Sequence, residues 1–539
     1  MLAAAGSLEA RADKSTVCTI TVNSPDEREM FRRSLPDDQF QFVELVERGR
    51  PDWLASACRR GIRCDLLVIS GHFDAGTEFY SDRLDAREFL PVEEMERVSC
   101  SDSCPGLFSQ LKEVYLFGCN TLNAATVEST AAEVARSLVR SGHSPADAGR
   151  LAQALNERHN ESNRDGMRRI FLNVPVIYGF SALAPLGPTA ATILGRYFQS
   201  TPAAEVGTGR ASPRLVSHFA VNSMTVTSGL GDSDPRAGYR REVCQFFDER
   251  LSPAQKLGFV HELLSREMAE VRMFFERIEK LLASLPDDAH RTPPVAGVLG
   301  EIARDEAARD RYLAFARDVD RPPIRVRMMN VARTLGWLSP ADERAETVRM
   351  IGNLLAGDAL NPADMNLVCA LNKDGALDRE FSRFELSPRQ AHEVTHAAAL
   401  ACLGSVAGRA RVLEALVGAN EDEVGIAQVY FHHRPLADDG ELRLVATGIA
   451  RMTGAEAQVR ALDTLARQYV ADRESLDTLT GLFPRARSVN VQRAIAGVLI
   501  RADYRAIAKP ELARMLRQHR LKSPDGADLI DVLIRRLQA

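Results

Sequence analysis

A histidine and a cysteine in the first third of the chain have residue types and positions suited to covalent catalysis. His72 follows the apolar run Leu66-Leu-Val-Ile-Ser70, and Cys119 follows the run Val114-Tyr-Leu-Phe117. A cysteine peptidase needs a thiolate nucleophile, a histidine that transfers protons, and N–H donors that stabilise the tetrahedral oxyanion. Cys119 and His72 could supply the first two, which predicts hydrolysis of peptide bonds through a thioester acyl-enzyme.

Two buried strands would have to hold these side chains together. The strands expected at 65–70 and 113–117 are the most apolar parts of an alternating strand and helix pattern that runs from Val17 to about Phe198. Continuous apolar runs are typical of central strands in a parallel sheet, and ligands bind beyond the carboxyl ends of such strands. If the two strands are neighbours, His72 and Cys119 lie side by side. The remaining predicted elements are strands at 17–22, 40–45 and 174–178 and a helix at about 189–198.

The residues around Cys119 favour an exposed, reactive thiol. Gly118 permits a tight turn at the end of the strand. A helix is expected to start near Asn123, and a thiol close to a helix N-terminus ionises more readily than a free one.

The two strand ends resemble those of the caspase superfamily, which includes caspases, metacaspases, gingipains, separase and bacterial CHAT domains. In these enzymes one apolar strand ends in His-Gly, and a later one ends in a small residue and the catalytic Cys. The matching blocks here are Leu66-Leu-Val-Ile-Ser-Gly-His72 and Val114-Tyr-Leu-Phe-Gly-Cys-Asn-Thr121. The segment Val174-Pro-Val-Ile-Tyr-Gly-Phe-Ser181 and the helix after it resemble the strand and helix that follow the nucleophile. The resemblance implies a caspase-like α/β fold.

The resemblance also implies a role for each residue of the site. Cys119 would attack the scissile carbonyl and His72 would protonate the leaving amine. Backbone N–H groups near Phe73 and at the turn of Gly118 would form the oxyanion hole. Phe73 stands where the family has Gly, and it lacks glycine's backbone freedom. An inactive caspase-like scaffold is therefore the first alternative. The sequence does not identify the residue after which a substrate would be cleaved. Asp65, Asp74 and Asp82 are nearby acidic residues that could bind a basic side chain at that position.

A second catalytic motif lies in the C-terminal half of the chain. His392-Glu393-Val394-Thr395-His396 matches H-E-x-x-H, in which two histidines one helical turn apart bind Zn²⁺ and the glutamate is the general base. Glu421 or Glu414 could be a third ligand, and Ser387-Pro388 is the expected start of the helix. No β pattern surrounds the motif to align a substrate, and the histidines could simply line a solvated helix face. A zinc metallopeptidase is the second alternative.

Cysteine usage predicts a reduced protein. Nine cysteines is an odd number, and they are spread through a long chain, which argues against a disulfide framework. Cys100 and Cys104 lie in the loop that leads to the Cys119 strand. They could be a redox pair, two ligands of a zinc site, or small packing residues.

Beyond a linker rich in Gly, Ser, Asp and Pro at 231–240, helical patterns replace the β patterns. Apolar residues at i, i+4, i+7 and i+8 mark amphipathic helices, and joined helices of this length suit HEAT-like repeats. Two such stripes are Ile324, Met328, Val331 and Ala332, and Val491, Ile495, Val498 and Leu499. The predicted organisation is a flexible N-terminus at 1–16, an α/β caspase-like domain at 17–230 with a parallel-rich sheet flanked by helices, and an all-α HEAT-like repeat domain at 241–539.

Composition and charge limit the partners and the location. The 539 residues are 45% hydrophobic and 26% charged, with a net charge of −5, so the chain is an ordinary globular protein without a basic field for nucleic acid. The first nine residues lack the positive charge and apolar length of a signal peptide. We therefore expect a cytoplasmic bacterial cysteine endopeptidase without cofactor or metal. Its expected partners are a protein or peptide substrate and a regulatory protein on the helical repeats, with no nucleic acid and no membrane.

Overall fold

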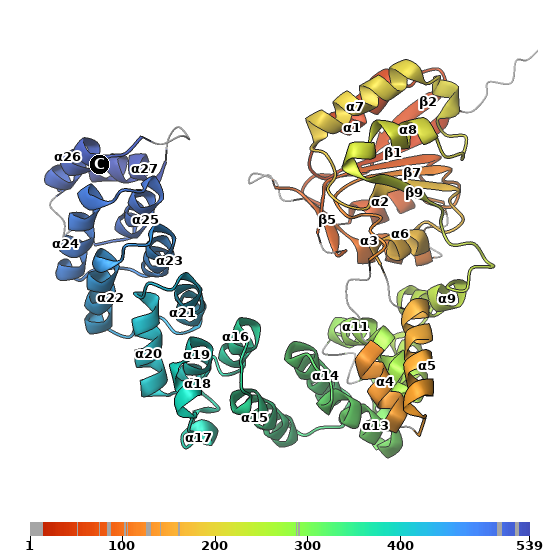
Figure 1. Cartoon of the computed structure of the whole chain (residues 1–539). Helices are drawn as coiled ribbons and strands as arrows, with labels where there is room; N and C mark the ends of the chain where they lie inside the picture. Colours follow the sequence, from red (N-terminus) through yellow and green to blue (C-terminus); the bar gives the residue numbers. More distant parts are fainter. Residues whose placement is uncertain are drawn as a thin grey trace, which may run out of the picture. The chain divides into compact units, whose positions relative to one another are not determined.

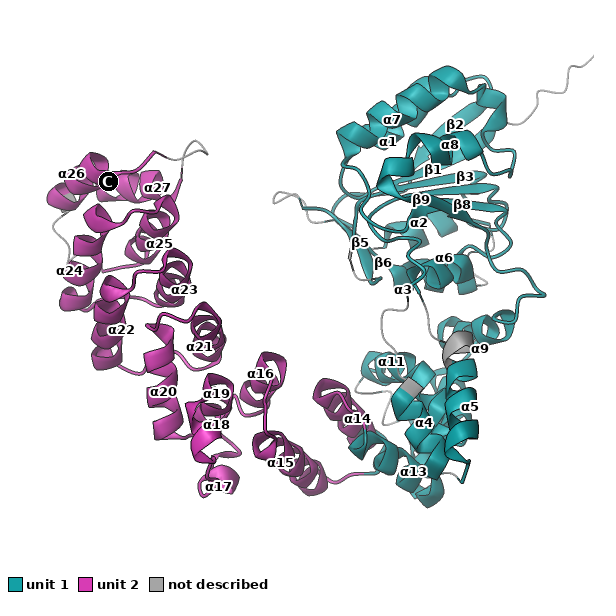
Figure 2. Cartoon of the chain, viewed as in Figure 1, with its two compact units in different colours: residues 1–318, 334–337 teal, residues 319–333, 338–539 magenta. Residues whose placement is uncertain are grey.

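A computed structural model shows the arrangement of these elements. It describes residues 14–538 except residues 51, 75, 83–87, 102, 103, 105, 126–130, 141, 160, 161, 287, 289–291, 504–508 and 523–527. The chain divides into two compact units, residues 1–318 with 334–337 (unit 1) and residues 319–333 with 338–539 (unit 2), as Figure 2 shows. Within the described residues, every helix is too short or too polar to cross a bilayer.

Unit 1 is built on a sheet flanked by helices (Figure 1). Its described strands number six, in the order β2-β1-β3-β7-β8-β9. All neighbours are parallel except β8 and β9, which are antiparallel. Every residue of β3, β7 and β8 is buried, which explains why these strands have continuous apolar sequences. The strands are β1 (Ser15–Thr21), β2 (Phe40–Glu44), β3 (Leu66–Ser70), β7 (Glu113–Phe117), β8 (Val176–Phe180) and β9 (Met224–Thr227).

Helices cover both faces of this sheet, and each face has its own core. Successive side chains of a strand point to opposite faces, so Leu66 and Val68 of β3 enter one core and Leu67 and Ile69 enter the other. The first core lies under α1 (Asp26–Ser34), α7 (Gly187–Ser200) and α8 (Pro213–His218). The second lies under α2 (Trp53–Arg59), α3 (Val92–Cys100) and α6 (Asn163–Ile170). The prediction of an α/β part with a mainly parallel sheet is confirmed.

A small antiparallel sheet follows β3 directly and carries His72. Its described strands are β4 (His72–Asp74), β5 (Glu78–Tyr80) and β6 (Phe89–Pro91), in the order β4-β5-β6. β6 runs straight into α3. Strands of three residues are too short to show an alternating pattern, so the sequence contains no signal for this sheet.

Unit 1 extends beyond the sheet into a group of helices. Helices α4 (Ala131–Arg140) and α5 (Pro145–His159) follow β7 in the chain but pack on α11 (Met268–Ser284) rather than on the sheet. Val134, Leu138 and Ala269 belong to their shared core. Part of the expected linker is helical, because α9 starts at Ala237, and Ser15 and Thr16 of the expected flexible N-terminus belong to β1. The other helices here are α9 (Ala237–Phe247), α10 (Pro253–Leu264), α12 (Pro293–Arg304) and α13 (Glu306–Arg317).

The described part of unit 2 is helical throughout. Helix α21 packs on α23, α23 on α25 and α25 on α27, while α20 packs on α22 and α22 on α24. This packing of every second helix gives a layered stack. Both predicted apolar stripes are buried, and the one on α25 belongs to the core of this stack. The helices are α14 (Pro322–Thr334), α15 (Pro340–Ala356), α16 (Pro362–Leu371), α17 (Asp378–Phe381), α18 (Pro388–His392), α19 (Val394–Cys402), α20 (Val406–Leu416), α21 (Glu421–His433), α22 (Asp439–Arg451), α23 (Ala455–Ala466), α24 (Arg473–Leu482), α25 (Val489–Ile500), α26 (Lys509–His519) and α27 (Leu529–Gln538).

The expectation of reduced thiols is wrong for this structure. Among the described residues there are four disulfides, Cys18–Cys64, Cys58–Cys104, Cys100–Cys244 and Cys369–Cys402, and Cys119 is the free cysteine. Cys100 and Cys104 are bonded to different partners, so they are neither a redox pair with each other nor a pair of zinc ligands. Disulfides are typical of oxidising compartments. They weigh against the expected cytoplasmic location, which stays a prediction.

Candidate active site

His72 and Cys119 line the same narrow cavity at the carboxyl edge of the six-stranded sheet. The free volume of the cavity is about 50 Å³, room for the end of one side chain. Three successive strands of the sheet contribute to it, because residues that follow β1, β3 and β7 all reach its wall, together with the loop after β8. The lining residues are Asn23, Ser24, Glu27, Gly71, His72, Phe117, Gly118, Cys119, Ala184, Pro185, Leu186 and Gly187.

The two strand ends that carry His72 and Cys119 are pressed together. The register pairs Ser70 with Phe117, and the Gly71 N–H donates to the Phe117 carbonyl at 3.1 Å. A Cβ atom on Gly118 would lie 2.9 Å from the Phe73 Cβ and 3.0 Å from the Gly71 carbonyl oxygen. Gly118 is therefore needed for the close approach of the backbones, rather than only for a flexible turn.

Phe73 lies next to Gly118, and its side chain is buried in the core. It is 6% exposed, and its ring centroid is 4.7 Å from that of Phe79 on β5. The residue that departs from the family pattern thus has a packing role of its own: its apolar side chain anchors β4 to β5.

Cys119 lies in a turn, so the prediction of a helix starting near Asn123 is wrong. Residues 118–122 form the turn, and the first helix described after it, α4, begins at Ala131. Asn120 takes the left-handed conformation, with φ 58°, and its N–H donates to the Ala182 carbonyl at 2.7 Å. The backbone N–H of Ala184 donates to the Cys119 Sγ at 3.3 Å. This N–H, rather than a helix dipole, is positioned to stabilise a thiolate.

The exposed carboxylate of Asp82 contacts the His72 imidazole. The His72 Nε2 lies 3.3 Å from Asp82 Oδ2, and the imidazole packs 5.4 Å from the Tyr80 ring. This contact engages Nε2, so Nδ1 is the ring nitrogen that could exchange a proton with another group. Of the other acidic residues named from the sequence, Asp65 lies at the amino end of β3, where it accepts from the Thr16 N–H. The side chain of Asp74 lies outside the described part of the structure.

Glu27 is a site residue that sequence reasoning missed. It lies on α1, lines the cavity, and is only 3% exposed. The pKa of Glu27 is raised to about 7, mainly by burial and to a smaller extent by the charge of Asp26, while its backbone N–H and the Ser70 hydroxyl oppose the shift. Its Oε2 atom has no hydrogen-bond partner. Acidic residues are common in the first turn of a helix, so nothing in the sequence distinguished Glu27 from Asp26 or Glu29.

The H-E-x-x-H motif does not lie on one helix. α18 ends at His392, Glu393 is extended, and α19 begins at Val394. His392 is exposed, whereas His396 is fully buried, with Nε2 3.1 Å from the Gly357 carbonyl oxygen and Nδ1 3.2 Å from Glu393 Oε2.

The surroundings of the motif do not supply a metal site either. Glu421 lies 3.7 Å from Arg460, and Glu414 is exposed. No group of three or more His, Cys, Asp or Glu side chains in the described ranges could hold a metal ion. The expected helix start at Ser387 and Pro388 is confirmed. The motif lacks the continuous helix that a zinc site of this type needs.

Comparison with protein-family models, curated proteins and solved structures finds no match to this chain.

The close approach at Gly118 predicts that even a methyl group there is disruptive. Gly118→Ala should lower the free energy of unfolding by about 1–3 kcal/mol, because Phe73 or the Gly71 backbone must move; urea unfolding measures this. Gly149→Ala is the matched control, since a Cβ at Gly149 in α5 meets nothing within 4 Å, and it should be neutral or slightly stabilising. Equal stability of the two variants would contradict the close approach.

The raised pKa of Glu27 predicts a pH-dependent cost to stability. The folded state holds the Glu27 proton up to about pH 7, whereas the unfolded chain releases it near the ordinary value, so stability should fall as pH rises between these two values. At pH 8, Glu27→Gln should be more stable than the wild type by on the order of 3 kcal/mol, with the advantage gone by pH 4. Urea unfolding at both pH values measures this, with Glu29→Gln as control. An equal difference at both pH values would contradict it.

Proposed function

We propose that this chain is a cysteine endopeptidase of caspase type, with Cys119 as the nucleophile and His72 as the proton-transfer residue. The observation that carries the proposal is that both side chains line one cavity, at the ends of two adjacent parallel strands. The parallel-rich sheet flanked by helices supports it, because ligands bind at this edge of such sheets. Cys119 is also the free thiol among cysteines that are otherwise in disulfides.

The chemistry follows from these positions. His72 takes the thiol proton at Nδ1, and the Cys119 thiolate attacks the scissile carbonyl carbon. The imidazolium of His72 then protonates the leaving amine, which leaves a thioester on Cys119. His72 next takes a proton from water, and the hydroxide attacks the thioester. The acid product leaves, and His72 returns the proton to the Cys119 sulfur. Asp82, at 3.3 Å from His72, stabilises the imidazolium during both halves.

The tetrahedral oxyanion needs N–H donors close to Cys119. We assign this role to backbone N–H groups near Phe73 and at the turn of Gly118, which the close approach of β3 and β7 brings together. Phe73 supplies an N–H just as glycine would, and its buried side chain fixes β4 in place.

The cavity also favours one class of residue on the amino side of the cleaved bond. A buried carboxyl with an oxygen that lacks a partner gains most from a cation, because pairing restores the lost interaction and favours the ionised form. We therefore propose that Glu27 receives a lysine or arginine side chain of the substrate. An acidic side chain there would face a like charge.

The helical stack of unit 2 supports a regulatory role. Stacked helical pairs of the HEAT type present extended surfaces to protein partners. Val406, Leu444 and Tyr469 are large apolar side chains that are 84%, 52% and 64% exposed on these helices and their loops. We propose that a regulatory protein binds this stack.

An inactive caspase-like scaffold is the second candidate, and one observation favours it. Phe73 replaces the family glycine and is locked into the core by Phe79, so β4 cannot adjust its backbone as glycine would.

Labelling with a peptide-like thiol electrophile at neutral pH separates the two candidates. Under non-reducing conditions an active site predicts fast modification of Cys119, mapped by mass spectrometry. His72→Ala should slow it by about 100-fold or more, whereas His143→Ala, at an exposed histidine, should not. Equal labelling rates with and without His72 would favour the scaffold.

Peptide substrates test the assignment of Glu27. With the wild type, kcat/KM should be higher for a peptide with arginine before the cleaved bond than for the same peptide with alanine. Glu27→Gln should lower this ratio by about tenfold or more, equivalent to at least about 1.4 kcal/mol. If Glu27→Gln leaves the ratio unchanged while the enzyme is active, the cation is bound elsewhere.

A further inference from the structure

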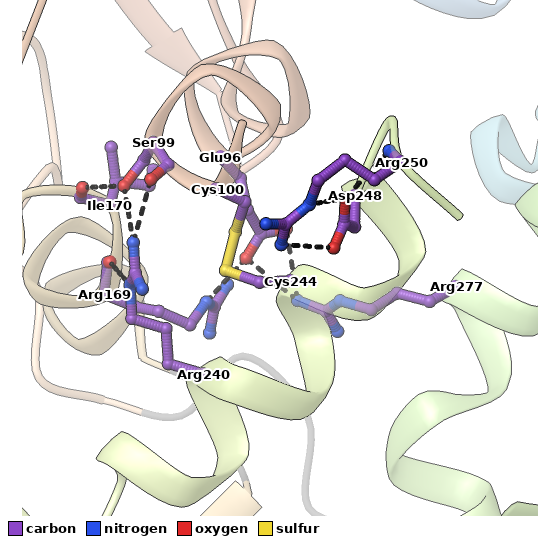
Figure 3. Close-up of a disulfide and its surroundings, with 10 residues drawn as sticks. All are labelled: Glu96, Ser99, Cys100, Arg169, Ile170, Arg240, Cys244, Asp248, Arg250 and Arg277. Carbon is purple, nitrogen blue, oxygen red and sulfur yellow. Dashed lines mark hydrogen bonds and ion pairs between the residues drawn. A yellow bond between two sulfur atoms is a disulfide. The ribbon is translucent and has the colours of Figure 1, made fainter. Parts of the chain in front are cut away.

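Helix α3 connects the sheet of unit 1 to the helices that follow it in the chain. Helix α3 packs with α2 and α6, which cover the sheet, and also with α9. Glu96 of α3 is buried and lies 2.6 Å from Arg169 and 3.3 Å from Arg277 (Figure 3). Helix α3 therefore contacts both the helices that cover the sheet and the helices that follow the sheet in the chain. We call it the junction between these two parts of unit 1.

The polar contacts between α3 and α9 are specific. The Arg240 guanidinium of α9 donates to the Ser99 carbonyl at 2.9 Å and to its hydroxyl at 3.1 Å, and also to the Arg169 carbonyl (Figure 3). Arg97 of α3 lies 3.2 Å from Glu249, just beyond α9. These are hydrogen bonds and ion pairs at a partly exposed surface, and each is weak when exposed.

One covalent bond holds the same junction. The Cys100–Cys244 disulfide joins the last residue of α3 to α9 across 144 residues of chain (Figure 3). Both of its cysteines are half-buried. In Cys58–Cys104 only Cys58 is half-buried and Cys104 is 8% exposed, and in Cys18–Cys64 and Cys369–Cys402 all four residues are fully buried. Exchange requires an attacking thiolate to reach a sulfur atom, so these disulfides differ in the property that decides whether they react.

A cavity gives access to this disulfide. Cys100 and Cys244 line a cavity of about 520 Å³, and so do Arg240, Arg241 and Arg250. Arg250 is paired with Asp248 on the same wall. Neighbouring cationic side chains favour the thiolate that leaves when a disulfide is attacked. The cavity thus combines access with a favourable charge for exchange.

We propose that Cys100–Cys244 is an exchangeable disulfide whose reduction by a dithiol, such as the Cys pair of a disulfide reductase, releases α9 from α3. A thiolate of the dithiol attacks one sulfur and forms a mixed disulfide, and the other sulfur leaves as a thiolate. The second thiol of the dithiol then attacks the mixed disulfide. Two electrons and two protons pass from the dithiol to Cys100 and Cys244, and the dithiol becomes a disulfide.

Release of α9 from α3 can affect the candidate active site through connected strands. β6 continues directly into α3, and β6 pairs with β5, which pairs with the β4 strand that begins at His72. If the proposed peptidase function is right, loosening α3 changes the position of His72 and hence the reactivity of Cys119. This step rests on that function, whereas the exchange itself does not.

Graded reduction of the oxidised full-length protein tests the exchange. The protein is equilibrated at increasing ratios of reduced to oxidised dithiothreitol, and each cysteine pair is quantified by differential alkylation and mass spectrometry. We expect Cys100–Cys244 to open at a ratio at least tenfold lower than Cys369–Cys402 or Cys18–Cys64. Opening at the same or a higher ratio, or absence of this disulfide from the oxidised protein, overturns the proposal.

Hydrogen exchange tests the release. When Cys100–Cys244 alone is open, amides of α9 should exchange faster, as they should in the oxidised Cys244→Ser variant, while the amides of α19, where Cys402 lies, should not change. Unchanged protection of α9 in the reduced wild type overturns the release even if Cys244→Ser fails to fold. Cys119 labelling rates before and after reduction then report on the link to the site; a null result there with intact exchange and release removes only that link.

Discussion

The backbones at the carboxyl ends of β3 and β7 approach so closely that no side chain fits at Gly118. Parallel pairing brings Ser70 opposite Phe117, and the turns that follow place His72 and Cys119 on one cavity. A methyl group at Gly118 would meet Phe73 and the Gly71 backbone at about 3 Å. The geometry of the candidate site therefore depends on a backbone contact, and the side chains that would perform chemistry are held by it.

Glu96 and Glu27 are both buried carboxyls, but their pKa values are shifted in opposite directions. Burial opposes the charge of both Glu96 and Glu27, but Arg169 and Arg277 outweigh it at Glu96 and lower its pKa. Glu27 has no such partner, and burial raises its pKa to about 7. The arginines therefore keep Glu96 ionised inside the junction, whereas Glu27 keeps its proton up to about pH 7 beside the cavity.

The cysteines form two groups, those in disulfides and the free Cys119. Four disulfides among the described residues remove eight thiols from chemistry, and Cys119 alone of the described cysteines keeps a free sulfur, with an N–H donor at 3.3 Å. The half-buried Cys100 and Cys244 distinguish their disulfide from Cys18–Cys64 and Cys369–Cys402, whose four residues are buried.

The sequence by itself determined the apolar strands, their parallel arrangement and the amphipathic helices, because burial on both faces or on one stripe leaves a local pattern of apolar residues. It therefore predicted that His72 and Cys119 lie side by side if their two strands are neighbours. Only the tertiary structure decided the turn at Cys119, the break of the H-E-x-x-H helix at Glu393, the disulfide partners and the place of Glu27. These depend on contacts between residues far apart in the chain, such as Cys100 with Cys244, which no local pattern records.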